Sequence, residues 1–410
     1  MIKSILIGIG AAGISALMLL QSWPAAKISS GSGKGDPTRP YSFKSDAPIK
    51  TNQALLRKEQ LSADIAPRLR INAKKTLESA PLNEDAVFHL AIADILENPQ
   101  ADIIPLLTEA SLRNARNRRV LKTLIQQQSS TGDIKGILKN VDILYRLERD
   151  DQGTYLTILD LLYQNANARA EIGQYLESDP DWAYIFLARQ VGSFYERFVN
   201  IDELTALVKT YVRQSKDTTL RTRLVERYLY LLVKLNRPEE AYNYWRELYQ
   251  ESGSSVPTIN NSKFTELDAA PPFNWKLFYG PTGGAEFDDS SGLFAFHNSE
   301  VAQLIARQYI HINPTSSYAL KAKVFGSISP QKGWFEWRMT CISDKTLWHV
   351  TPIIPDNVSD DMLTDILPPA ASETCTFVDV KLYGLPGTYA DRFNLQIASL
   401  ELSPFEETTP

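Results

Sequence analysis

The segment GWFEWRMTC, residues 333–341, decides the fold of the C-terminal third of this 410-residue chain. Large apolar side chains occupy every second position: Phe335, Trp337, Met339 and Cys341. A period of two is typical of a β-strand with one buried face. Trp334, Glu336 and Arg338 have the opposite parity, so we expect them on the other face of the strand.

The segments around this strand repeat the pattern. Residues 318–324 alternate in the same way, and further strands are expected at 292–297, 301–312, 347–352, 376–383 and 393–403. Turn residues separate them, at Gly283-Gly284, Asn313-Pro314 and Pro386-Gly387. Seven or eight short strands over about 130 residues predict an antiparallel β-sandwich across residues 271–404.

Residues 51–252 have a different period. Apolar residues recur there at helical spacing, and amphipathic helices begin near Asp102, Asp133, Ala168, Asp202 and Glu239. The successive separations are 31, 35, 34 and 37 residues, and an apolar helix precedes each of these helices. A repeat near 34 residues built of helix pairs predicts an α-solenoid, whose repeats bury their apolar faces against one another.

The segment NRPEEAYNYW, residues 236–245, places the small residue Ala241 four positions before the aromatic Trp245. In this respect the chain resembles the tetratricopeptide-repeat family over about residues 80–252, although Ile137 and Val141 depart from its pattern of alanine and a large aromatic residue. The resemblance implies a concave surface for a peptide or protein partner. The alternative is that the helices act only as a spacer.

Four segments of the C-terminal region carry a second resemblance: 273–277 (FNWKL), 317–320 (SYAL), 333–337 (GWFEW) and 395–402 (LQIASLEL). Over about residues 270–404 they resemble the jelly-roll sandwich of carbohydrate-binding modules, also described as galactose-binding-like. The resemblance implies a fold and a possible polysaccharide ligand, although many such sandwiches bind protein or nothing.

Glycan recognition requires exposed aromatic rings beside polar side chains that pair with hydroxyl groups. The candidate ligand-binding residues are Trp334, Trp275, Trp348, Tyr383, Glu336 and Arg338. Asn274, Asp288 and Asp289 are further possible polar partners. For the aromatic residues other than Trp334, a place in the core is the competing interpretation, whereas the parity of Trp334 opposes the apolar face.

The N-terminal segment SILIGIGAAGISALMLL, residues 4–20, has no charge and is just long enough to cross a bilayer. We expect a retained single-pass anchor over residues 1–22 in the inner membrane, with the body in the periplasm; a cleaved signal is the alternative. Its G-x-G-x-x-G pattern lacks the acidic residue and the βαβ unit of a dinucleotide site.

Cys341 and Cys375 are the only cysteines, and they lie 34 residues apart. In an oxidising compartment they are expected to form a disulfide, the alternative being two buried thiols. The net charge of −5 argues against nucleic acid as a partner. The four histidines show no catalytic or metal-binding spacing, so no catalytic residue, metal or cofactor is predicted. The acidic pairs at 288–289 and 360–361 are interpreted as solvated loops, with calcium ligands as the alternative.

The predicted fold class is therefore a multidomain α + β chain. Its segments are an anchor (1–22), a flexible linker (23–50), helical repeats (51–252), a second linker (253–270), a β-sandwich (271–404) and a tail (405–410). Such a chain is expected to act as a non-enzymatic envelope scaffold, with a protein partner on the helical repeats and polysaccharide or another subunit on the sandwich. Accessory work in surface polysaccharide assembly or export fits that role. A glycan-active enzyme with its site between the domains and a structural spacer are the alternatives.

Overall fold

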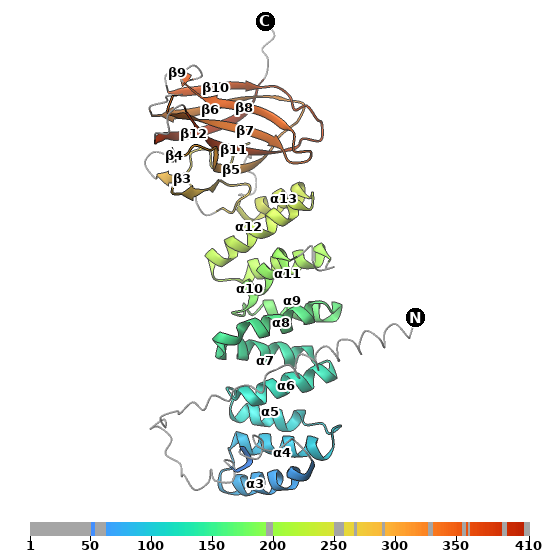
Figure 1. The fold of residues 1–410 in the computed structure, drawn as a ribbon. Coiled ribbons are helices and arrows are strands. Elements are labelled where there is room, and N and C mark those ends of the chain that lie inside the picture. The colour runs from blue at the N-terminus through green and yellow to red at the C-terminus, as the bar shows by residue number, and fades with distance from the viewer. Residues whose placement is uncertain are drawn as a thin grey trace. The chain divides into compact units, whose positions relative to one another are not determined.

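The structure is a computed structural model that describes residues 51–53, 63–193, 200–249, 258–265, 269–288, 292–326, 331–354, 358–359, 361–387 and 392–405. The chain forms two compact units, Met1–Phe186 and Leu187–Pro410. The first consists of helices in its described part, and the second contains helices followed by a β-sandwich (Figure 1). A helical part followed by an antiparallel sandwich is the architecture predicted from the sequence.

In chain order, the helices are η1 (Ala63–Ile65), α3 (Ala66–Ser79), α4 (Glu84–Glu97), α5 (Ile104–Arg113), α6 (Arg118–Thr131), α7 (Ile134–Leu147), η2 (Arg149–Asp151), α8 (Gln152–Tyr163), α9 (Ala166–Leu176), α10 (Ala183–Gly192), α11 (Ile201–Gln214), α12 (Thr218–Lys234) and α13 (Pro238–Tyr249). The helices predicted near Asp102, Asp133, Ala168, Asp202 and Glu239 correspond to α5, α7, α9, α11 and α13.

Asparagine or aspartate side chains cap the start of six of these helices. Asn83, for example, accepts a hydrogen bond from the backbone N–H of Ala86, and Asp217 accepts one from Leu220. The same kind of cap precedes α6, α7, α9 and α11. Because the first N–H groups of a helix have no partner within the helix, each cap satisfies a donor that would otherwise be unpaired.

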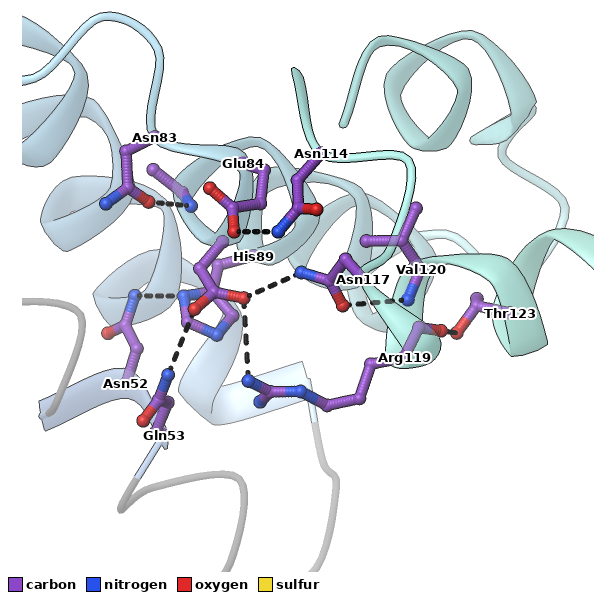
Figure 2. Close-up of polar contacts among 12 residues, drawn as sticks. Asn52, Gln53, Asn83, Glu84, His89, Asn114, Asn117, Arg119, Val120 and Thr123 are labelled. Atoms are coloured by element: carbon purple, nitrogen blue, oxygen red, sulfur yellow. Dashed lines mark hydrogen bonds and ion pairs between the residues drawn. The ribbon is translucent and has the colours of Figure 1, made fainter. Parts of the chain in front are cut away.

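Within the unit Met1–Phe186, apolar side chains of α4, α5 and α6 form a shared core. It contains Val87, Phe88, Ala91, Ile103, Leu107, Ala110, Val120 and Leu124. Beside this core, Asp85 at the start of α4 accepts hydrogen bonds from Gln53 and Asn117, and Arg119 Nη2 lies 3.5 Å from its Oδ1. The partners Gln53, Asn117 and Arg119 are labelled in Figure 2. This network joins α4 to the loop before α6 and to residues 51–53.

The sandwich has two antiparallel sheets. Its strands are β1 (Lys276–Leu277), β2 (Tyr279–Gly280), β3 (Gly283–Asp288), β4 (Gly292–His297), β5 (Gln303–His311), β6 (Ser317–Phe325), β7 (Gly333–Cys341), β8 (Leu347–Ile353), β9 (Val358–Ser359), β10 (Met362–Leu367), β11 (Phe377–Pro386) and β12 (Phe393–Phe405). The five-stranded sheet has the order β1-β5-β11-β7-β8, and the seven-stranded sheet has the order β2-β3-β4-β12-β6-β10-β9.

The core between the sheets has the predicted parity. Phe335, Trp337 and Met339 of β7 lie in it, as do alternate residues of β6 such as Leu320 and Val324. The opposite residues of β7, including Trp334 and Arg338, therefore lie on the outer face of the five-stranded sheet. The predicted disulfide is also confirmed: Cys341 at the end of β7 is bonded to Cys375.

The sequence prediction missed five strands: the two-residue strands β1, β2 and β9, and the longer strands β3 and β10. β3 begins at Gly283-Gly284, which were expected to form a turn, and β10 was not expected at all. Gly284 lies in a strand because β2 passes very close to it: a Cβ at this position would come within 2.8 Å of Tyr279 Cα. Glycine inside a strand often marks such a close approach of backbones.

The membrane prediction requires a correction. Among the residues that the structure describes, no helix combines the length and the apolar character needed to cross a bilayer. The transmembrane part of the predicted fold class, and with it the inner-membrane, periplasmic placement, is therefore wrong by this finding. The predicted anchor (1–22) and linker (23–50) lie outside the described residues.

Candidate functional site

The candidate site lies on the outer face of the five-stranded sheet. Four of the six predicted ligand-binding residues are on this face: Trp334, Glu336 and Arg338 from β7, and Tyr383 from β11. Core residues of both strands point the other way, between the sheets. The antiparallel register sets Glu336 directly opposite Tyr383 and Arg338 opposite Lys381.

Trp334 is the aromatic residue of this group whose ring is least engaged. Its indole is half-buried, and no ring contact or hydrogen bond involves it within the described part of the chain. Its cross-strand neighbour is Leu385, which is buried. A crevice of about 10 Å³ beside Trp334 has room for no more than a water molecule, so a ligand would contact the indole from the open face of the sheet.

The ring of Tyr383 is engaged by the protein itself. The guanidinium of Arg338 lies 4.6 Å from the centre of this ring, within the range of a cation–π contact. Arg338 also forms an ion pair with Glu336, whose side chain is buried. The ring of Tyr383 therefore holds Arg338 in place. It is less available to a ligand than the ring of Trp334, although both were predicted to bind one.

Beside the ion pair of Glu336 and Arg338, the same face carries a second charged group, centred on Asp379. Asp379 accepts two hydrogen bonds from Arg307, at 2.7 and 2.6 Å, and lies 2.9 Å from Lys381 Nζ. Arg307 also donates to the hydroxyl of Tyr309 at 2.7 Å. Burial alone would lower the pKa of Arg307, but the hydrogen bonds and the charge of Asp379 outweigh it, so the pKa is raised and the guanidinium stays charged.

The far end of this face is covered by helices of the same compact unit. Tyr242 of α13 packs against Phe377 of β11 and His311 of β5, with ring centres 5.8 and 5.6 Å apart. Tyr230 of α12 packs edge-on against Tyr309 at 5.9 Å. The open part of the face therefore extends from the row of Arg307 and Lys381 toward Trp334.

Two predicted ligand residues lie elsewhere. Trp275 is 4% exposed and packs in the core against Phe264 and Trp337, so its assignment as a binding residue was wrong. Trp348 is half-buried and donates its indole N–H to the carbonyl of Pro368, away from the open face. Trp275 is part of the apolar core between the sheets, and Trp348 packs against that core.

The weaker polar candidates are also separate from this face. Asn274 is buried, and its side-chain amide donates to the carbonyl of Ala269. Asp288 is exposed at the end of β3 in the other sheet. Asp289 lies outside the described residues.

Sequence reasoning missed the charged residues that flank the site. Asp379, Lys381 and Tyr383 occupy every second position of β11, and this alternation was a usable signal. No local signal was available for a polar cluster between the sheets, where Asp365 lies 2.9 Å from His349 Nε2 and accepts a hydrogen bond from Thr351 at 2.7 Å. Across the described residues, no group of three or more potential ligands is placed to hold a metal ion.

The helices carry a larger crevice, of about 150 Å³, on α11, α12 and α13. It is lined by Thr205, Lys209, Tyr228, Leu232, Glu240, Asn243, Tyr244 and Glu247. Lys209 Nζ lies 4.8 Å from the ring centre of Tyr244 and 3.4 Å from Glu247. Burial raises the pKa of Tyr228 to about 12, so its hydroxyl stays protonated and bonded to Thr205. The crevice thus combines aromatic walls with charged rims.

Similarity to known proteins is found among solved structures. No protein-family model matches the chain, and no curated protein matches it. Among solved structures, one described as "CBM4 structure and function" is 14% identical over 34% of this chain and 99% of its own, with a TM-score of 0.25.

A second solved structure is described as "Structural basis for the promiscuous specificity of the carbohydrate-binding modules from the beta-sandwich super family". It is 15% identical over 36% of this chain, with a TM-score of 0.25, and the present chain spans 63% of its length. At such values neither similarity assigns residues or a ligand.

Proposed function

We propose that this protein is a non-enzymatic glycan-binding scaffold whose sandwich holds a polysaccharide chain on the outer face of the five-stranded sheet. The observation that carries the proposal is the half-exposed indole of Trp334 on a sheet face that also bears Arg338 and Lys381. Aromatic rings stack against the apolar faces of sugars, while charged and polar neighbours pair with hydroxyl groups.

Binding is favoured over catalysis by the state of the two carboxylates on this face. Glu336 accepts a hydrogen bond from Arg338, and Asp379 is shared by Arg307 and Lys381. Glycoside hydrolysis requires one carboxyl group that donates a proton and a second that acts as base or nucleophile. Carboxylates held by cations are suited instead to orienting those cations toward a ligand.

We further propose that the helical pairs act like tetratricopeptide repeats and dock a protein partner. Supporting this role is the crevice on α11–α13, where Tyr228 and Tyr244 form walls beside Lys209 and Glu247. Apolar walls with charged rims suit an extended peptide segment. A scaffold that joins a protein to a glycan in this way would serve polysaccharide assembly or export.

The test of glycan binding is retention of the full chain on an array of polysaccharides, with Trp334→Ala as the variant. Tyr279→Ala is the matched control, because Tyr279 is 75% exposed on the other sheet. We expect wild type and Tyr279→Ala to bind the same glycan and Trp334→Ala to lose about tenfold or more in affinity, the order of a lost aromatic contact. Equal binding by Trp334→Ala, or no retained glycan for wild type, would overturn the proposal.

A further inference from the structure

Four cations lie in one row across the five-stranded sheet, on its outer face. The register pairs Lys276 of β1 with Arg307 of β5, Arg307 with Lys381 of β11, and Lys381 with Arg338 of β7. Neighbouring strands are about 4.8 Å apart, so the row spans about 14 Å. We define these four residues as the cation row.

Such a row costs stability, because like charges directly opposite each other on neighbouring strands repel. Three acids offset the repulsion: Glu226 lies 2.6 Å from Lys276, Asp379 serves both Arg307 and Lys381, and Glu336 pairs with Arg338. Four cations against three acids leave one positive charge in excess. The excess lies at Arg307 and Lys381, where one carboxylate serves two cations.

The cations face the solvent more than their partners do. In each of the four ion pairs the cation is the more exposed side chain, at 20–38% against 8–25% for the acid. Asp379, at 8%, lies beneath Arg307 and Lys381. A ligand approaching this face therefore meets positive groups first.

We propose that the glycan held on this face is acidic, with a carboxylate or sulfate group bound at Arg307, Lys381 and Arg338 while Trp334 contacts a neighbouring sugar ring. This inference rests on the proposed glycan binding and adds the chemical class of the ligand. Trp334 lies four residues from Arg338 along β7, about 13 Å at the rise of a strand, so the ligand is an oligosaccharide rather than a single sugar. Arginine and lysine suit such anions because charge-assisted hydrogen bonds are the stronger ones.

The overall charge of the chain would not attract an acidic glycan. The chain carries a net charge of −5, which repels a polyanion at a distance. Attraction must therefore come from the cation row itself. It should weaken as salt is added, because the side chains of the row are partly exposed and so are screened.

The test uses the full chain and four probes: polygalacturonate, chondroitin sulfate, the neutral glucan laminarin and a single-stranded DNA oligonucleotide. The two acidic glycans distinguish carboxylate from sulfate as the bound group. We expect one of them to bind more tightly than laminarin or DNA, with an affinity that falls as NaCl is raised. Lys381→Gln should weaken that binding by about five- to tenfold, the effect of losing one charge-assisted contact.

Lys321→Gln is the matched control, since Lys321 is an exposed lysine on β6 of the other sheet and should leave affinity unchanged. Lys381→Gln should fold, because Arg307 keeps Asp379 as its partner; a circular-dichroism melting curve checks this. Equal binding of laminarin and the acidic glycans, unaffected by Lys381→Gln, would overturn the inference and leave glycan binding standing. Equal binding of DNA would also overturn it, and binding of no glycan would remove both proposals.

Discussion

His89 is a residue that folding holds in its neutral form. It is fully buried on α4, with Nδ1 3.4 Å from the amide of Asn52 and Nε2 without a hydrogen-bond partner in the described part of the chain (Figure 2). Burial lowers the pKa of His89 from 6.5 to about 4; Asp85 opposes this effect and Arg119 adds to it. The unfolded chain therefore binds a proton between pH 6.5 and 4 that the folded chain does not.

Acid is expected to destabilise the helical unit through this histidine. The loss in free energy of unfolding is absent above the unfolded pKa of 6.5 and grows as the pH falls toward 4. It reaches about 3 kcal/mol, because each unit of pKa corresponds to about 1.36 kcal/mol. His89→Gln should flatten the pH dependence of the free energy of unfolding, measured by denaturant titration with far-ultraviolet circular dichroism. His311→Gln, at an exposed histidine, is the control, and equal slopes for wild type and His89→Gln would contradict the prediction.

At the scale of elements, the disulfide fixes the end of β7 to the chain just before β11. Cys341 and Cys375 close a loop with a sequence separation of 34. A cross-link of this length removes conformational freedom from the unfolded chain, worth about 4 kcal/mol in the entropy model and usually 2–4 in measurements. The double variant Cys341→Ala/Cys375→Ala should lose about that much stability, measured by denaturant titration with tryptophan fluorescence. Reduced wild type should have the same free energy of unfolding as the double variant. A double variant as stable as oxidised wild type would show that the disulfide does not stabilise the fold.

The elements were predictable where their pattern was local. The alternation in β6 and β7 indicated the buried faces correctly and placed Trp334 outside the core. β10 was missed because its inward positions are Leu363, Asp365 and Leu367, and the central acid interrupts the apolar alternation. Asp365 is accommodated there by His349, a partner from the other sheet that no local pattern indicates.

The site was predictable only in part because its residues come from strands far apart in the sequence. Strand order and register bring four cations into one row: Lys276, Arg307, Arg338 and Lys381. Neither the order nor the register can be inferred from any one segment of the sequence. Trp275 illustrates the opposite case: the sequence left both a binding role and a place in the core open, and Trp337 and Phe264 pack against its ring in the core. Parity identifies the face of a strand, whereas tertiary contacts decide whether that face is open.

At the scale of the whole molecule, the last helix pair belongs to the same compact unit as the sandwich. Tyr242 of α13 contacts Phe273 with ring centres 5.1 Å apart, and Trp245 donates its indole N–H to the carbonyl of Ala270 at 2.8 Å. Glu226 of α12 adds the ion pair with Lys276. These contacts bury aromatic surface between the helices and the five-stranded sheet, so we expect α12, α13 and the sandwich to unfold together.

Tyr242→Ala tests this coupling, because Tyr242 is only 7% exposed and its removal leaves a cavity among Phe273, His311 and Phe377. Truncating a buried aromatic residue costs about 3–5 kcal/mol. In hydrogen-exchange mass spectrometry, amide protection should fall in α12 and α13 and also in β5 and β11, which the two helices cover. Tyr279→Ala, on the other sheet, should leave this protection unchanged. Loss of protection confined to α13 would mean that the helices and the sheet unfold independently.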